Sequence, residues 1–195
     1  PQLDHIVPDT VKRVLTQVDL LRSIAAEFSL LGRPGDLERE ALDLHQLVSE
    51  AVERYGPGAL LKVNLDDANL PLVLANADSL QKILGNLMQN SLDATAEGSK
   101  TVLDIGWRIQ DESVTLLWAD HGTGLDAGVA DRLFDPYFST KSKGTGLGLA
   151  ICRNLADRMG GSIILRSRPD GTRENPGALA ELTLPRVEAD NPEGH

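Results

Sequence analysis

Four short motifs follow one another between residues 80 and 151 of this chain. The first is a helical segment at 80–94 that carries Asn86 and Asn90. It is followed by Asp-His-Gly-Thr-Gly-Leu at 120–125, Leu-Phe-Asp-Pro-Tyr-Phe-Ser-Thr-Lys at 133–141 and Gly-Thr-Gly-Leu-Gly-Leu-Ala-Ile at 144–151. One glycine-rich segment says little, because glycine also marks ordinary turns. All four motifs in this order are much harder to obtain by chance, and they indicate a nucleotide site.

The composition describes an acidic globular protein. Of its 195 residues 41% are hydrophobic but only 4% are aromatic, so the core must be mainly aliphatic. The formal net charge of −10 argues against nucleic-acid binding, which requires a positive surface. The one cysteine, Cys152, excludes an internal disulfide and a cysteine-based zinc site. It lies on the apolar side of a predicted helix, which indicates a core residue rather than a nucleophile.

A separate helix is predicted ahead of the domain, over residues 10–33. Gly32 and Pro34 end this helix, and the polar segment 32–40 marks a domain boundary. We therefore expect a single helix within 1–34, a globular domain at 40–186 and a disordered tail at 187–195. Apolar residues of the helix alternate at spacings of three and four, as in a coiled coil or a helical bundle: Val11, Val14, Val18, Leu21, Ala25 and Phe28.

Helical and strand patterns alternate within the expected domain. This order predicts an α+β fold, a two-layer α/β sandwich preceded by one long helix. Its sheet is expected to be mixed and mostly antiparallel, with the helices on one face. Helices are expected at 43–54, 79–96 and 147–159, with Asp43 and Asp78 as N-caps of the first two. Strands are expected at 59–65, 71–75, 101–110, 113–119, 162–168 and 178–184.

Asn86 and Asn90 lie four residues apart and therefore share one face of their helix. This face differs from the apolar stripe, so we expect both amides to point into a cleft. An asparagine carbonyl oxygen is a hard, neutral ligand that suits Mg²⁺, an ion that also bridges nucleotide phosphates. A lone pair of asparagines more often lies on a solvated helix face. The neighbouring motifs make the binding interpretation the better one.

Asp120 ends a predicted strand and begins a glycine turn. A carboxylate that faces an adenine can accept a hydrogen bond from its exocyclic amine. Gly122 and Gly124 would permit the tight turn and a close approach of the backbone to the base. Such a turn alone is commonly an ordinary loop, but in this position we assign the adenine contact to Asp120. We interpret His121 as a loop residue and not as a catalyst.

Phe134 and Phe138 frame the segment that leads to the second glycine run. We expect them to anchor a short mobile lid, with one ring packed toward the nucleotide pocket, a role compatible with plain core packing. Lys141 and Lys143 form a local positive feature in an acidic chain. Their ammonium groups suit phosphate as point charges, although lysines are equally common on solvated surfaces.

Gly144 begins a run that leads directly into the helix expected at 147–159. Backbone N–H groups at the N-terminus of that helix would therefore lie at the phosphates. The Gly-x-Gly-x-Gly spacing differs from the dinucleotide fingerprint. It also differs from the P-loop, because no lysine follows at the position that a P-loop requires.

Together the motifs resemble the ATP-binding domain of sensor histidine kinases, within the wider group of gyrase, MutL and chaperone ATPases. The helix at 10–33, followed by Gly-Arg-Pro, resembles the second helix of the dimerisation hairpin in kinases of the nitrogen-regulation type. This resemblance implies ATP and Mg²⁺ as cofactors, with Asn90 as the magnesium ligand. The nucleotide-binding residues that it implies are Asn86, Asn90, Asp93, Asp120, Gly122, Gly124, Phe138, Thr140, Lys141, Lys143, Gly144, Thr145, Gly146, Leu147 and Gly148.

Position 86 distinguishes enzyme classes within the group. In the ATP-hydrolysing relatives the residue four before the metal-binding asparagine is a glutamate, the base that activates water. Asn86 cannot take a proton at neutral pH, so the resemblance favours transfer of the γ-phosphoryl group to a protein histidine. In the family this phosphate passes on to an aspartate of a response regulator. The resemblance also implies a homodimer through helix 10–33 in the intact protein.

The phosphate-accepting histidine of the family lies on the first hairpin helix, where an acidic residue follows it. His5, His45, His121 and His195 do not match that pattern. We therefore assign no catalytic residue, and we expect a fragment that cannot autophosphorylate alone.

Three alternatives stay open: a chaperone- or repair-type ATPase, a serine/threonine kinase of the anti-sigma type, and a regulatory module that binds nucleotide or a partner without transferring phosphate. We expect a cytoplasmic domain, whether or not a membrane anchor holds the parent protein.

Overall fold

The computed structural model describes residues 11, 37–55, 61–65, 70–126, 128–141, 144–172 and 176–187. Apart from Val11, the helix predicted at 10–33 lies outside the described residues. The same holds for Lys143 and for the predicted tail beyond Val187.

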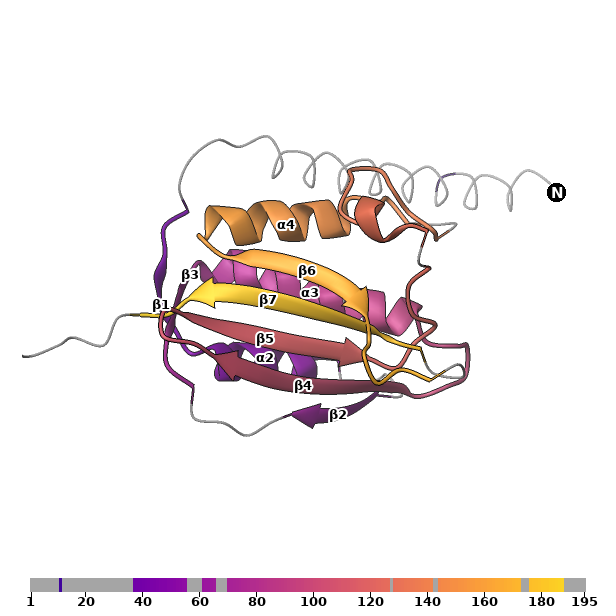
Figure 1. The fold of residues 1–195 in the computed structure, drawn as a ribbon, viewed down its shortest axis with the longest axis horizontal. Helices are drawn as coiled ribbons and strands as arrows, with labels where there is room; N and C mark the ends of the chain where they lie inside the picture. The colour runs from indigo at the N-terminus through magenta and orange to yellow at the C-terminus, as the bar shows by residue number, and fades with distance from the viewer. Residues whose placement is uncertain are drawn as a thin grey trace, which may run out of the picture.

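The main sheet has five strands in the order β2-β4-β5-β7-β6 (Figure 1). The β2 and β4 strands run parallel, whereas every other neighbouring pair in this sheet is antiparallel. The predicted mixed and mostly antiparallel sheet is therefore confirmed. The strands are β2 (Leu61–Leu65), β4 (Thr101–Ile109), β5 (Ser113–Asp120), β6 (Ser162–Ser167) and β7 (Ala178–Pro185).

Three helices pack on one face of this sheet: α2 (Leu44–Tyr55), α3 (Ala77–Asp93) and α4 (Gly148–Arg158) (Figure 1). Strand side chains alternate between the two faces, so that inward-facing apolar residues meet the apolar stripes of the helices. None of the helices that the structure describes has both the length and the apolar character of a membrane span. Buried members of this mainly aliphatic core include Leu84, Leu103, Leu116, Trp118, Ile151 and Leu182.

A second, two-stranded sheet was not predicted. The short strand β1 (Glu40–Leu42) pairs antiparallel with β3 (Val73–Ala75). Three residues, two of them exposed, carry too little alternation to be read as a strand. Nearby, Nη1 of Arg39 donates a hydrogen bond to the carbonyl oxygen of Met159, 3.1 Å away, at the C-terminal end of α4. The start of the domain is therefore tied to the end of that helix.

The predicted N-cap of α3 was wrong. Asp78 lies within the first turn, and the N-cap is Asn76, whose side chain accepts a hydrogen bond from the Ser79 amide at 3.0 Å. The helix also ends at Asp93 rather than at residue 96. The carbonyl oxygen of Ala94 accepts a hydrogen bond from the amide of Thr123 at 3.0 Å, a tertiary contact that sequence periodicity does not reveal.

Candidate functional site

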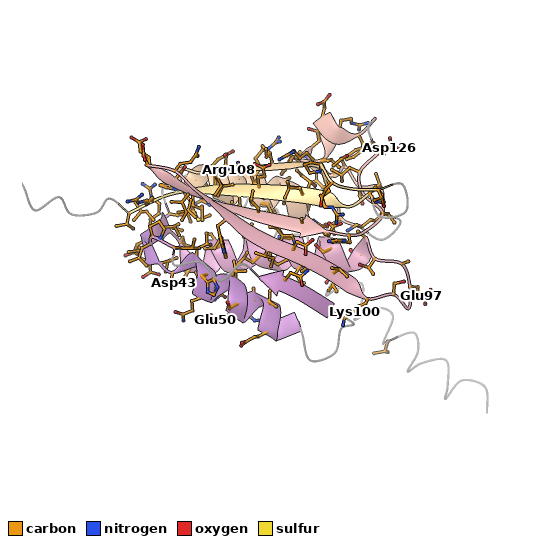
Figure 2. All side chains as sticks on the ribbon, turned by 60° about the horizontal axis from the view of Figure 1, so that its bottom comes forward. Asp43, Glu50, Glu97, Lys100, Arg108 and Asp126 are labelled. Atoms are coloured by element: carbon orange, nitrogen blue, oxygen red, sulfur yellow. The ribbon has the colours of Figure 1, made fainter. Side chains whose placement is uncertain are left out.

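The β5 strand and the α3 helix finish at the same end of the sheet (Figure 1). Residues at this end line a cavity of about 540 Å³. Figure 2 shows Asp126, in the loop after β5, and Glu97, in the turn after α3, at this end of the molecule, with Asp43 and Arg108 toward the other. Residues from α3, β5, β7 and the start of α4 line the cavity, together with segments 123–125, 138–141 and 144–146.

Most of the residues predicted for the nucleotide site come together around this cavity. The lining residues among them are Asn86, Asn90, Asp93, Asp120, Gly124, Phe138, Thr140, Lys141, Gly144, Thr145, Gly146 and Gly148. Of the other three, Gly122 is buried and Leu147 is fully buried in the core, so neither lines the cavity. Lys143 lies outside the described residues.

Asp120 is a buried carboxylate at the end of β5. Its Oδ1 accepts hydrogen bonds from the backbone amides of Gly122, at 2.9 Å, and Ala178, at 3.1 Å. Within the described part of the chain, the hydrogen bonds to this carboxylate all fall on Oδ1. Burial raises the pKa of Asp120, against the two amides, which lower it. One oxygen is thus held by the backbone, and Oδ2 can accept a hydrogen bond from a ligand.

The turn after Asp120 needs glycine for two separate reasons. A Cβ on Gly122 would lie 2.6 Å from the Cβ of Ala94, so a side chain would displace the end of α3. Gly124 has a φ of +74°, a conformation that side chains disfavour. The carbonyl oxygen of Gly122 also accepts a hydrogen bond from the amide of Gly177 at 3.1 Å. The turn is therefore braced by the segment that precedes β7.

Ala178 belongs to the candidate site, although the sequence did not reveal it. Its contribution is a backbone amide, which leaves no signature in the identity of the side chain. The only sequence signal was Pro176-Gly177 in a polar turn, and a Cβ on Gly177 would lie 2.2 Å from the carbonyl oxygen of Asp120. The apolar cavity walls were also missed, since they look like ordinary core residues: Leu87, Trp118, Leu125, Leu133, Leu149, Leu165 and Ala180.

Four polar residues gather at the α3 side of the cavity. Nζ of Lys141 lies 2.9 Å from Oδ1 of Asn90 and 2.9 Å from Oδ2 of Asp93. Burial works to raise the pKa of Asp93, but the hydrogen bonds from Lys141 and Gln89 outweigh it and lower this pKa. The oxygens of Asn90 and Asp93 are hard ligands for a cation, and they already bind one cationic side chain, that of Lys141.

The side chain of Asn86, on α3, lies beside the start of α4. Its Nδ2 donates to the carbonyl oxygen of Lys82 at 3.1 Å. A Cβ on Gly148 would lie 2.8 Å from Oδ1 of Asn86, so the two helices approach closely here. Cys152, on the same side of α4, is fully buried, and burial raises the pKa of its thiol to about 12. The interpretation of Cys152 as a core residue is confirmed.

Phe134 and Phe138 have different environments. Phe134 is buried, and the guanidinium carbon of Arg153 lies 3.9 Å from its ring centroid. Phe138 lines the cavity, with Arg132 4.4 Å from its ring centroid. The expectation that one ring packs toward the pocket is met by Phe138. Between them, Tyr137 adopts a φ of +67°.

Gly146 secures the base of this segment. Its carbonyl oxygen accepts a hydrogen bond from the Tyr137 amide at 3.0 Å. Its own φ is +68°, and a Cβ there would lie 2.5 Å from the carbonyl carbon of Tyr137. Backbone packing this close holds the segment at Tyr137 and Phe138 against the glycine run.

The N-terminus of α4 opens at the cavity. The helix begins at Gly148, which lines the cavity, and its N-cap residue Leu147 makes no side-chain capping hydrogen bond. The first N–H groups of an α-helix have no partner within the helix, and together with the helix dipole they favour an anion. This arrangement suits a phosphate group.

Comparisons with known proteins agree with this geometry. A family model described as "Histidine kinase-, DNA gyrase B-, and HSP90-like ATPase" matches residues 75–188. The C4-dicarboxylate transport sensor protein DctS of Rhodobacter capsulatus is 35% identical over 151 residues, which cover 74% of this chain and 22% of that protein. The sensor histidine kinase ZraS of Escherichia coli (strain K12) is 30% identical over 184 residues, 91% of this chain and 38% of that protein. The chain thus spans well under half the length of these curated relatives.

Solved structures show the same architecture. The catalytic domain of histidine kinase ThkA is 26% identical with a TM-score of 0.65, and the match covers 77% of this chain and 97% of that one. Full-length ShkA, solved in complex with AMPPNP, is 26% identical with a TM-score of 0.66, over 84% of this chain and 35% of that one. The chain therefore belongs to the histidine kinase-, DNA gyrase B- and HSP90-like ATPase family, and its globular part is the ATP-binding catalytic domain of a sensor histidine kinase.

Proposed function

We propose that this domain serves a kinase that transfers the γ-phosphoryl group of ATP to a histidine on a hairpin helix, for relay to an aspartate of a response regulator. The observation that carries this proposal is that the carboxylates lining the cavity already have hydrogen-bond partners, so none of them stands ready to activate water. The position of the water-activating glutamate of the hydrolytic relatives is taken by Asn86, whose amide is a poor base. The two carboxylates that line the cavity are engaged elsewhere, Asp93 with Lys141 and Asp120 with two backbone amides.

The proposed orientation of ATP follows from the chemistry at the two ends of the cavity. Asp120, with Oδ2 available, would accept a hydrogen bond from the exocyclic amine of adenine. Asn90, the open N-terminus of α4 and Lys141 would meet the phosphates. Catalysis would then consist mainly of positioning and of neutralising the charge that develops on the transferred group.

Magnesium fits the donor set on the α3 side of the cavity. Oδ1 of Asn90 is a hard oxygen, and the ammonium group of Lys141 already lies against it as a stand-in cation. We propose that Asn90 holds Mg²⁺, with Asp93 close by. When bound, the ion would offset the negative charge of the nucleotide phosphates.

The proposal requires an acceptor histidine from a hairpin helix. Of the histidines that the structure describes, His45 faces the ring of Trp107, with ring centroids 6.0 Å apart, and His121 pairs with Asp104. Neither lines the cavity. We therefore propose that the helix predicted at 10–33 joins a hairpin in a homodimer and that this hairpin presents the acceptor. We also propose that the domain works in the cytoplasm, the compartment that supplies ATP.

Calorimetry with ADP and Mg²⁺ tests the site. We expect the wild-type chain to bind, Asp120→Asn to bind much more weakly, and Asn90→Ala to lose the dependence of affinity on Mg²⁺. Asp111→Asn, an exposed carboxylate in the turn between β4 and β5, is the control and should bind like the wild type. Unchanged affinity in both site variants would overturn the site assignment.

A phosphotransfer assay tests the reaction. The chain would be mixed with a separately supplied hairpin that carries the acceptor histidine, and with ATP labelled on its γ-phosphate. Label on histidine would support the kinase, whereas label on serine or threonine would support an anti-sigma-type kinase. Steady release of phosphate without labelled protein would indicate an ATPase. Nucleotide binding without labelled protein and without phosphate release would indicate a regulatory nucleotide-binding module.

A further inference from the structure

Lys141 connects the lid segment to α3. Its ammonium group donates to Oδ1 of Asn90 and to Oδ2 of Asp93, both at 2.9 Å. The two partners lie on neighbouring turns of one helix, and Lys141 lies about fifty residues later in the chain. One cation therefore bridges a neutral amide oxygen and a carboxylate across the mouth of the cavity.

Both ends of this bridge are held by further hydrogen bonds. The Lys141 amide donates to Oγ of Ser139 at 3.1 Å, and its carbonyl oxygen accepts from the Gly144 amide at 3.3 Å. On α3, Nε2 of Gln89 donates to Oδ1 of Asp93 at 2.7 Å, so that Oδ2 faces Lys141. A Cβ on Gly144 would lie 2.4 Å from Oγ of Ser139, so glycine lets these two residues approach closely. The lysine is thus positioned by the backbone and not only by its own charge.

We propose that Lys141 is a tethered cation that holds Asn90 and Asp93 in the nucleotide-free protein and gives up the Asn90 oxygen to Mg²⁺ when the nucleotide binds. This inference rests on the proposed function, because it takes Asn90 as the magnesium ligand. We call the Lys141–Asn90–Asp93 contact the lid latch. Lys141 acts in it as a positioning residue.

The competition follows from the distances. Mg²⁺ binds oxygen at about 2.0–2.1 Å and in near-octahedral geometry, which leaves no room for an ammonium group on the same side of the amide oxygen. Once Lys141 leaves Asn90, the N–H that it donated there can bind a phosphate oxygen, while another N–H still pairs with Asp93. In the nucleotide-free protein the Lys141 side chain therefore bridges Asn90 and Asp93. When nucleotide binds without Mg²⁺, the same side chain partly substitutes for the metal.

Two measurements on the complete chain test the lid latch. The first is hydrogen exchange of the lid peptide 138–146 without nucleotide, measured by mass spectrometry. The second is the magnesium factor, defined as the Kd for ADP in excess EDTA divided by the Kd for ADP with saturating Mg²⁺. The variants are Lys141→Met and Asp93→Asn. Their matched controls, Lys100→Met and Glu97→Gln, remove the same charges at exposed positions that do not line the cavity (Figure 2).

We expect both latch variants to increase lid exchange by about two- to fivefold, the range of a half-exposed ion pair. Lys141→Met should also increase the magnesium factor by a similar amount, since the metal-free complex loses its substitute cation. Asp93→Asn should lower this factor, because it removes a negative charge that repels bare phosphate and attracts the metal. Both controls should behave like the wild type.

Lid exchange equal to the controls in both latch variants would overturn the inference. An unchanged or lower magnesium factor in Lys141→Met would do so as well, while leaving the proposed function intact. Wild-type protein that binds no ADP under either condition would instead overturn the proposed function, and the inference with it.

Discussion

Oδ1 of Asp120 accepts a hydrogen bond from the backbone amide of Ala178, 3.1 Å away and 58 residues later in the chain. The contact joins the last residue of β5 to the first residue of β7. With the Gly122 amide, it commits one carboxylate oxygen to the backbone and fixes the direction of the other. A hydrogen-bond acceptor is thus held at one end of the cavity before any ligand arrives.

Replacement of Asp120 by asparagine should weaken nucleotide binding without unfolding the protein. The new Oδ1 can still accept from Gly122 and Ala178, but an NH₂ group then faces the amine of adenine, and two donors cannot pair. We expect the Kd for ADP with Mg²⁺ to rise about 10- to 100-fold, the loss of one charge-assisted hydrogen bond.

The same variant gives an independent result on stability. Burial raises the pKa of Asp120, so the ionised carboxylate lowers the stability of the folded state at neutral pH, whereas a neutral amide does not. The Tm of Asp120→Asn should therefore equal or exceed that of the wild type at pH 7. A lower Tm accompanied by weak binding would point to damage to the fold rather than to the loss of a ligand contact.

Gly146→Ala should destabilise the protein and weaken nucleotide binding together. The residue has a φ of +68°, and the added Cβ would meet the Tyr137 carbonyl carbon at 2.5 Å. We expect the free energy of unfolding to fall by about 1–3 kcal/mol, measured by urea denaturation. Gly106→Ala is the control, because no atom lies within 4 Å of a Cβ at that position in β4. Its stability should be unchanged or slightly higher. Equal losses in both variants would contradict this account of Gly146.

Ser91→Ala should leave a buried donor without its partner. Nε1 of Trp118 donates to Oγ of Ser91 at 3.1 Å, and both side chains are buried. We expect the variant to lose about 1–3 kcal/mol of unfolding free energy and to change the fluorescence of Trp118, which lines the cavity. Ser49→Ala is a matched control, since among the described residues Oγ of Ser49 bonds only to the backbone carbonyl of His45 in its own helix. A loss no larger than that of the control would contradict the prediction.

Glu181 should contribute to the loss of stability in acid. Its carboxylate lies between Arg108, 3.1 Å away, and Arg166, whose Nε donates to it at 2.7 Å. Burial works to raise the pKa of Glu181, but the two arginines outweigh it and hold this pKa below the ordinary value of 4.5. A depressed pKa means that the stabilisation is present above the ordinary value and is lost as the pH falls through the folded-state pKa.

The measurement is the difference in unfolding free energy between the wild type and Glu181→Gln, obtained from urea titrations between pH 7 and pH 3. This difference should be largest at neutral pH and should shrink below about pH 4.5. Glu97→Gln, at an exposed turn, should show no such trend. A difference that stays constant with pH would show that Glu181 acts by packing and not by its charge.

Periodicity was enough to place the main helices and strands of the described domain, because a buried stripe or an alternating strand leaves a direct trace in the order of residue types. Periodicity failed where a tertiary contact determines the end of a helix or the presence of a strand. Asp78 has the chemistry of an N-cap, yet Asn76 caps α3, and its own Nδ2 donates to the Glu38 carbonyl oxygen at 2.9 Å. The β1 strand exists only because β3 lies beside it.

By itself the sequence determined the family, and it pointed to residues that line one cavity, since Asn90, Asp120 and the glycine run are recognisable as residue types at short, local spacings. Only the tertiary structure decided that Lys141 binds Asn90 and Asp93, and that the Ala178 amide orients Asp120. Contacts between residues far apart in the chain depend on how helices and strands pack. A backbone amide, moreover, has the same chemistry whichever side chain it carries, so no sequence pattern could have pointed to Ala178.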